Sequence, residues 1–256
     1  MNIGFSRHTS QVVQHHHICD EQVCIQAEEG ASATVFLMVS GLVDIVAHVK
    51  KHATLTVICL QVHEATITQR SILADSATIR WQNVSLAPVK HTLESRVEGP
   101  HTRSDIDWIF YAQGSEQQRI SASNVFEGSN GSGDIVLRGI AKDTAHVVCN
   151  GLINIGLKGS GTDTYLTEDV LMLDRTAKVD AIPGLEIKTN DVKASHSATV
   201  SKVTDEDLFY FASRGVDHAT ARQMYIVGFL ADITKSIANE EARIAVQNAI
   251  ELRAKS

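Results

Sequence analysis

The sequence predicts a mainly β protein that ends in a small helical region, and three observations support this class. From Ala33 to Val84 apolar and polar residues alternate, which is the pattern of strands with one buried face. After Thr204 the apolar residues recur at helical spacing instead. The chain has only 3 prolines, so its strands can run without the interruptions that proline causes.

Strands in the first part resemble one another, which indicates a repeated unit. Ala33–Val39, Ala53–Leu60 and Ala77–Val84 each begin with alanine and threonine, so we take these three alanines as equivalent. Ala65–Thr68 is a further short strand. Such units stack as turns of a solenoid around a column of inward side chains. The spacing varies, and strands of a β-sandwich alternate too, so the residues alone leave both architectures open.

Alternating segments continue towards the helical region. The expected strands are Asp107–Tyr111, Gln118–Phe126, Asp134–Ile140, His146–Ile155, Tyr165–Leu173 and Lys178–Ile187. Two glycine-rich turns, Gly128–Gly133 and Gly156–Gly161, lie between some of them. Neither turn has the Gly-Lys-Ser/Thr ending that cradles nucleotide phosphates, so we expect that this chain binds no nucleotide itself.

Three helices are expected at the C-terminal end. They cover about Asp205–Arg214, Ala219–Ile237 and Glu240–Ala254. Thr204 and Asp207 have the spacing of a capping box, and Gly215 is a typical helix-ending residue. A helical region this short cannot bury its apolar faces alone, so it must pack on the β body, on a partner or on both.

Composition excludes several classes of function. The 256-residue chain has a formal net charge of −7 and no long run of Lys or Arg, which argues against nucleic acid and anionic membranes as partners. It has no apolar run of the roughly 18 residues that a spanning helix needs. The first residues lack a secretory apolar region, and the 4 cysteines form no disulfide framework. We therefore expect a cytoplasmic protein.

The stretch from Pro183 to Gly215 combines a strand, one histidine on a strand and the start of a helix. Its motifs are Pro183-x-Leu185-Glu186-Ile187, Asp191-Val192, Ser195-His196-x-Ala198-Thr199-Val200, Asp207-x-Phe209-Tyr210 and Ser213-Arg214-Gly215. With these gaps preserved, the stretch resembles the C-terminal signature of the SufB/SufD family of iron–sulfur cluster assembly proteins. The resemblance extends upstream to Ala145 and downstream to Phe229.

This resemblance implies an architecture. Residues 20–203 would form a right-handed parallel β-helix, a solenoid rather than a sandwich. Residues 1–19 would be a separate N-terminal segment, and residues 204–256 a helical domain that docks an ATPase.

It also implies a function without catalysis. The chain would be a scaffold subunit of a SUF-type complex that assembles a transient iron–sulfur cluster at a dimer interface. Its implied partners are a SufC-like ABC ATPase and either a second copy of itself or another SufB/SufD-type scaffold. A cysteine desulfurase system is the implied sulfur source.

Two residues are the main candidates for holding a cluster or its iron. His196 occupies the family's histidine position, and imidazole is a ligand for iron. Glu168 occupies the position where the SufB branch has a cysteine. A carboxylate binds iron but accepts no persulfide sulfur. Ser195 and Ser197 replace the glutamates of the SufB branch, so the chain resembles SufD or short single-scaffold forms.

Other candidates are weaker. Cys149 has apolar neighbours that favour a core thiol, and His146 is read first as a packing residue; either is a second-rank ligand. His15–His17 with Cys19 and Cys24 have ligand types but no recognised metal spacing. The residues expected to bind the ATPase are Phe209, Tyr210, Arg214, Gly215, Gly228 and Phe229.

Two alternatives stay open. The chain could be a structural partner that stabilises another scaffold without binding a cluster. It could instead be a β-helix enzyme acting on carbohydrates, which needs two carboxylates across an open groove. The candidate groups for that reaction are Asp105 with Asp107 and Glu168 with Asp169.

Overall fold

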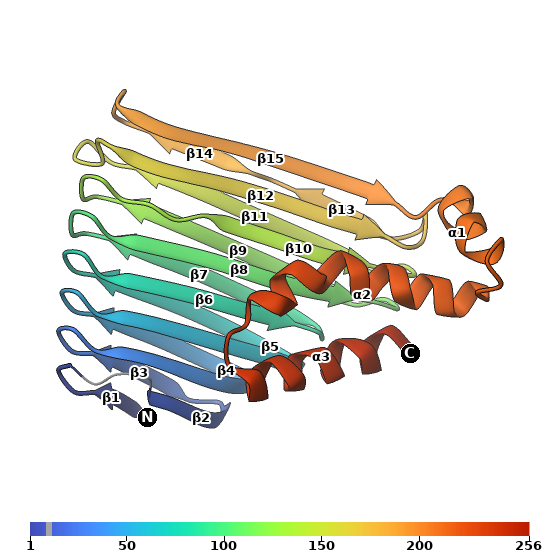
Figure 1. The fold of residues 1–256 in the computed structure, drawn as a ribbon, viewed down its shortest axis with the longest axis horizontal. Helices are drawn as coiled ribbons and strands as arrows, with labels where there is room; N and C mark the ends of the chain where they lie inside the picture. Colours follow the sequence, from blue (N-terminus) through green and yellow to red (C-terminus); the bar gives the residue numbers. More distant parts are fainter. Residues whose placement is uncertain (9–11, 256) are drawn as a thin grey trace.

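The computed structural model describes residues 1–8 and 12–255, which form a parallel β-solenoid with helices at the C-terminal end (Figure 1). The strands are β1 Asn2–Phe5, β2 Val12–Cys19, β3 Gln22–Ala27, β4 Ser32–Val49, β5 Thr54–Leu73, β6 Thr78–Ser85, β7 Val89–Val97, β8 Arg103–Ala112, β9 Gln117–Phe126, β10 Ile135–Ala141, β11 His146–Ile155, β12 Thr162–Met172, β13 Lys178–Ala181, β14 Gly184–Ile187 and β15 Val192–Lys202. The helices are α1 Asp205–Ala212, α2 His218–Ser236 and α3 Glu240–Lys255.

Each turn of the solenoid contributes to two facing parallel sheets (Figure 1). The sheet that the helices cover, here the covered sheet, contains β2, the first halves of β4 and β5, and β6, β8, β10, β12 and β15. The opposite sheet contains β1, β3, the second halves of β4 and β5, and β7, β9, β11, β13 and β14. Every pairing among the described strands is parallel, which confirms the solenoid and excludes the antiparallel sandwich.

Alternation along the strands builds one shared core between the two sheets. On the covered sheet, Val57, Trp81, Ile106, Ile135 and Leu166 lie in register as one inward column of buried side chains. The interior also holds polar side chains that bond across it. Gln69 and Asn83 exchange amide hydrogen bonds of 3.1 and 2.8 Å, so their burial leaves these amides satisfied.

A ladder of left-handed residues forms the corner where the chain passes from the opposite sheet to the covered sheet. Its members are His8, Gly30, His52, Ser76, His101, Asn130 and Gly161. Each donates its backbone N–H to a carbonyl of the next turn, as His52 does to Asp75 at 3.1 Å. The ladder fixes the register of the turns at a position where the residue type varies.

The sequence-based repeat was wrong by two residues at its first step. Thr54 pairs with Ser32, so Ala53 is equivalent to Ala31, and Ala33 pairs with Leu55. Ala31 and Ala33 are both buried, so residue type and burial alone did not show which of them is equivalent to Ala53.

The β body also begins earlier than expected. β1 pairs with β3 and β2 pairs with β4, so these two strands of the expected N-terminal segment belong to the solenoid rather than being set apart from it. Residues 9–11 of that segment lie outside the described residues.

Helices α2 and α3 lie across the outer face of the covered sheet (Figure 1). Their buried side chains, such as Leu230 and Val246, share a second core with Phe36, Ile109 and Leu171 of the sheet. The helical region is therefore fastened to the solenoid. No described helix is both long and apolar enough to cross a membrane.

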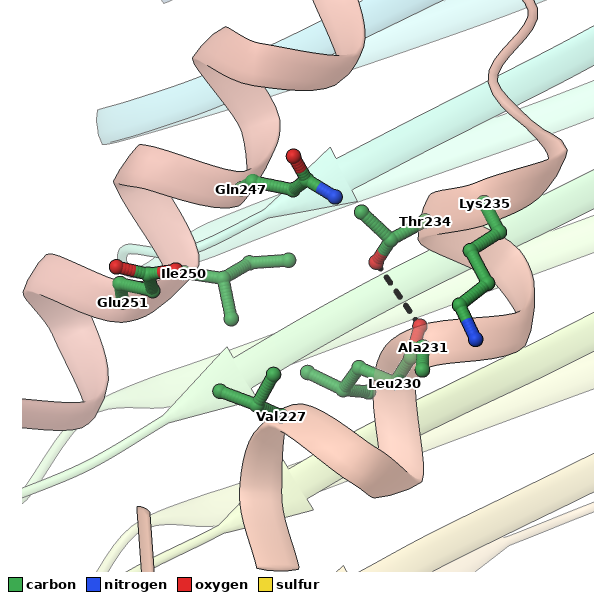
Figure 2. Close-up of a pocket in the computed structure, with 8 residues that line it drawn as sticks. All are labelled: Val227, Leu230, Ala231, Thr234, Lys235, Gln247, Ile250 and Glu251. Atoms are coloured by element: carbon green, nitrogen blue, oxygen red, sulfur yellow. Dashed lines mark hydrogen bonds between the residues drawn. The ribbon is translucent and has the colours of Figure 1, made fainter. Parts of the chain in front are cut away.

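A groove of about 220 Å³ separates α2 from α3 (Figure 2). Val227 and Ile250 line its apolar part, and Lys235 and Glu251 stand at its edges. Thr234 donates to the Leu230 carbonyl at 2.9 Å, so its hydroxyl is satisfied within α2. The groove is thus a small apolar depression between two packed helices.

Candidate functional site

The two ends of the solenoid differ in the burial of their inward side chains, which are buried at the first turn, here the closed end, and exposed at the last turn, here the open end. Among the described strands, β1 and β2 also have unpaired outer edges. In the first turns the inward residues Ile3, Phe5 and Ile18 are buried. In the last turn Val200 is 45 % exposed and Ile187 is 42 % exposed. Among the described strands, β15 pairs with β12, and β13 and β14 pair with β11, so the far edges of all three are unpaired. This open end presents sheet edges and apolar side chains together.

His196 lies on β15 at this open end. It pairs with Leu166 and therefore continues the inward column of the covered sheet. Unlike the buried residues of that column, His196 is exposed. The inward column of apolar side chains thus ends in an imidazole at the last turn of the solenoid.

Glu168 lies one turn inward, on β12, and is fully buried between the sheets. Its carboxylate accepts the backbone N–H of Gly151 at 2.7 Å. The Cys149 thiol points at the same carboxylate, with 4.0 Å between Sγ and Oε2. Burial raises the pKa of Glu168 to about 7, although the N–H groups of Gly151 and Ile182 oppose this. Burial and the Glu168 charge raise the pKa of Cys149 to about 12.

His146 is on the outer face of the opposite sheet, away from this interior pair. Its Nε2 lies 2.8 Å from the Asp180 carboxylate on β13. A cavity of about 600 Å³ borders this pair and extends to Ala198 and Val200 at the open end. The sequence did not indicate Asp180 as a partner, because the pairing of β11 with β13 joins residues far apart in the chain.

The four candidate ligands are therefore only partly brought together. Cys149 and Glu168 are in contact, and His196 lies on the adjacent strand, diagonal to Glu168. His146 faces away from them. Among the described residues no three His, Cys, Asp or Glu side chains are placed to hold a metal ion.

The candidate metal ligands near the N-terminus, His15–His17 with Cys19 and Cys24, also do not come together at one point. Consecutive strand residues point to opposite faces, so His15 and His16 diverge on β2. His15 lies 3.6 Å from Glu241 on α3 and packs edge-on against Phe36. The Cys19 thiol donates to Asp20 at 3.6 Å.

The expected ATPase-binding residues fall into two groups. On α1, Phe209 is 72 % exposed and Tyr210 is 57 % exposed, and the Arg214 guanidinium stacks 3.7 Å from the Tyr210 ring centroid. Gly215 follows with φ of 81°, the left-handed value that glycine adopts after a helix.

The second group lies on α2. Phe229 is partly buried against the covered sheet, with Arg138 5.5 Å from its ring centroid. A side chain at Gly228 would meet open space. Phe229 therefore fastens α2 to the sheet, whereas the α1 group forms an exposed aromatic surface.

The carboxylates considered for carbohydrate chemistry are engaged elsewhere. Asp105 bonds to Arg103 at 2.7 Å, and Asp107 lies 2.9 Å from Arg80. Burial raises the pKa of Asp107, and Arg80 opposes that shift. Glu168 points inward and its neighbour Asp169 outward, so they form no acid–base pair. The geometry gives this alternative no support.

The protein is of the parallel β-solenoid class. Its last turn is open and carries a histidine, and C-terminal helices cover one of its two sheets. The family described as "SUF system FeS cluster assembly, SufBD core domain" matches residues 8–229. The chain belongs to this SufBD family, which supports a role in iron–sulfur cluster assembly.

Similar curated proteins carry the same family name. The iron–sulfur cluster assembly SufBD family protein of Staphylococcus saprophyticus is 29% identical over 233 residues, which are 88% of this chain and 50% of that protein. The proteins of that name from Staphylococcus haemolyticus and Staphylococcus aureus are each 28% identical, with the same coverage. The chain thus spans about half the length of the curated relatives it matches.

Proposed function

We propose that this chain is a scaffold subunit on which iron–sulfur clusters are assembled where two scaffold bodies meet. The observation that carries the proposal is the open last turn, which exposes His196 beside unpaired sheet edges. Parallel strands with free edges extend readily by pairing with another strand. A second copy, or another SufBD-type chain, would cover the exposed apolar residues and bring a second set of ligands.

In this proposal His196 and Glu168 bind iron. Imidazole nitrogen and carboxylate oxygen are both competent iron ligands. Glu168 is buried in the single chain, so its participation requires the last turn to open. Because a carboxylate carries no persulfide, sulfur is delivered by a cysteine desulfurase system or accepted by Cys149.

An ABC-type ATPase supplies the energy in this proposal by docking on α1. Phe209 and Tyr210 are large exposed aromatics on one short helix, the type of residue that anchors partner interfaces. The ATPase shifts the scaffold only if its two nucleotide states bind the helices with different affinity. The scaffold itself catalyses no step.

Anaerobic reconstitution with Fe²⁺ and sulfide, with the ATPase co-expressed, tests the proposal. We expect visible cluster absorbance in the wild-type complex and its loss in His196→Ala. His63→Ala, which removes an exposed histidine far from the open end, is the matched control and should keep the absorbance. Equal absorbance in all three proteins would contradict the assignment of His196.

A structural, non-binding partner is the second candidate. It is favoured by the absence of any three-ligand group among the described residues. This role predicts no cluster absorbance in a homodimer of the wild type, but formation of a complex with another scaffold chain. The same reconstitution, run with and without that chain, therefore distinguishes the two functions.

A further inference from the structure

We propose that α2 holds the last turn of the solenoid closed over Cys149 and Glu168, and that Arg222 is the positioning residue through which it does so. The inference concerns a conformational device of this chain and does not depend on the proposed function. It is drawn from four successive links that lead from α2 to the interior pair, Cys149 and Glu168.

The first contact joins α2 to the corner that follows β12. Arg222 donates to the Leu173 carbonyl at 3.1 Å and to the Asp174 carboxylate at 3.2 Å. The two charged side chains are 27% and 31% exposed, so solvent screens this pair less than a fully exposed one. Arg222 also donates to the Leu173 carbonyl just after β12. A side chain that does not reach this carbonyl would leave it unpaired.

The second contact runs down the corner itself. Asp174 accepts the backbone N–H of Asp143 at 2.9 Å, and Asp143 accepts the N–H of Gly114 at 2.9 Å. Arg222 therefore sits at the end of a ladder of aspartate-to-backbone bonds that links successive turns. Holding Asp174 in place also holds the corner of the turn below it.

The third contact leads from the corner to the cover of the thiol. Four residues after Asp174 the chain enters β13, which pairs with β11 and has a free outer edge among the described strands. The Asp180 carbonyl of β13 accepts the Cys149 thiol at 3.8 Å. Ile182 then donates its N–H to the Cys149 carbonyl at 2.9 Å. Residues 174–182 thus form the lid over Cys149.

The fourth contact makes α2 act on β12 at a second point. Arg138 reaches from β10 to Asp169 on β12 at 3.2 Å and to Asp232 on α2 at 3.5 Å. α2 is thereby linked to β12 near Glu168 as well as at its end. A displacement of α2 away from the sheet would loosen both links and free the lid.

The test measures alkylation of the full chain by N-ethylmaleimide, resolved by cysteine with peptide mass spectrometry. In Arg222→Gln we expect Cys149 to react about tenfold faster, the effect of losing roughly one charge-assisted bond from a local opening equilibrium. Buried Cys59, far from the lid, and exposed Cys19 should keep their rates. Arg70→Gln, which breaks the Arg70–Asp44 pair at the other end of the solenoid, should leave Cys149 unchanged.

An unchanged Cys149 rate in Arg222→Gln would overturn the proposal, as would an equal increase in Arg70→Gln. If Cys149 and Cys59 accelerate together in Arg222→Gln, the variant unfolds globally and Asp174→Asn decides. That variant keeps an acceptor for the Asp143 N–H but loses the charge that Arg222 binds. Selective acceleration of Cys149 then supports the lid, and any other pattern refutes it.

Discussion

The carboxyl group of Glu168 is placed where its charged form is unfavourable. It is fully buried, and burial raises its pKa from 4.5 to about 7 despite the backbone donors around it. Near neutral pH the group is therefore close to half protonated in the closed chain. Opening of the last turn would return it to water and favour the carboxylate, which is the form that the proposed iron binding requires.

This placement predicts a pH-dependent stability. Below pH 4.5 the carboxyl group is protonated in both folded and unfolded chains, and its stabilising contribution is fully present. As the pH rises to about 7 the unfolded chain alone loses the proton, so stability falls, by roughly 3 kcal/mol at most. Above that pH the contribution is lost.

Glu168→Gln removes the titration and keeps an acceptor for the Gly151 N–H. We expect its unfolding free energy to match the wild type at pH 4 and to exceed it at pH 8. Urea denaturation of both proteins across this range measures the difference. Parallel pH profiles would show that Glu168 does not titrate as its burial implies.

The inward positions of Glu168 and Cys149 could be predicted in part from the sequence. Leu166, Glu168 and Val170 alternate with outward residues, so strand periodicity alone assigns Glu168 to the inward face. Cys149 was correctly favoured as a core thiol. Their contact was not predictable, because it joins two strands on facing sheets, and no local pattern reports which turn lies opposite which.

At the scale of elements, α1 differs from the other two helices. α2 and α3 pack apolar side chains against the covered sheet. α1 lies past the end of β15 (Figure 1), and its Phe209 and Tyr210 are exposed. Its capping box is complete, with Thr204 and Asp207 bonding to each other's backbone. The helix is thus locally stabilised yet lightly packed, which suits an element that docks a partner.

If an ABC-type ATPase docks on α1 as proposed, the double substitution Phe209→Ala/Tyr210→Ala should weaken its binding by at least about tenfold, because aromatic anchors carry much of an interface's energy. The melting temperature should change little, since both rings are exposed. Leu252→Ala on α3, where the side chain is 74% exposed, is the control for lost apolar surface. Titration calorimetry measures the ATPase affinity of both variants and of the wild type. Equal affinities in all three proteins would place the docking surface elsewhere.

Elements were predicted better than their register. The strand His146–Ile155 was placed with its observed bounds, and the three helices were placed within two residues. The strands before Ala33 and the strand Val89–Val97 were not recognised. The corner ladder was hidden because His52, Ser76 and His101 occupy left-handed positions that sequence patterns usually assign to glycine or asparagine.

For the whole molecule, the difference between the two ends predicts how it associates. Among the described residues, the inward side chains of the closed first turn are buried, whereas several in the open last turn are exposed. We expect a dimer through the open end. Val200→Glu, which puts a charge into that surface, should give a monomer in light scattering coupled to size exclusion.

Leu42→Glu is the matched control for this prediction, because Leu42 is 67% exposed near the closed end. It should leave the association state unchanged. A Val200→Glu protein with the wild-type mass in solution would place the contact between copies, if any, away from the last turn.

The helical hairpin of α2 and α3 also sets how cooperatively the protein unfolds. A solenoid is bound turn to neighbouring turn, so it tends to peel from its ends. Here the second core reaches from Phe36 on β4 to Leu173 after β12. The turns that share this core should therefore unfold together. β15 lies beyond that second core, whereas Arg222 ties the corner before β13 to α2. β15 is therefore free to fray while the rest of the body stays intact, so its amide hydrogens should exchange first.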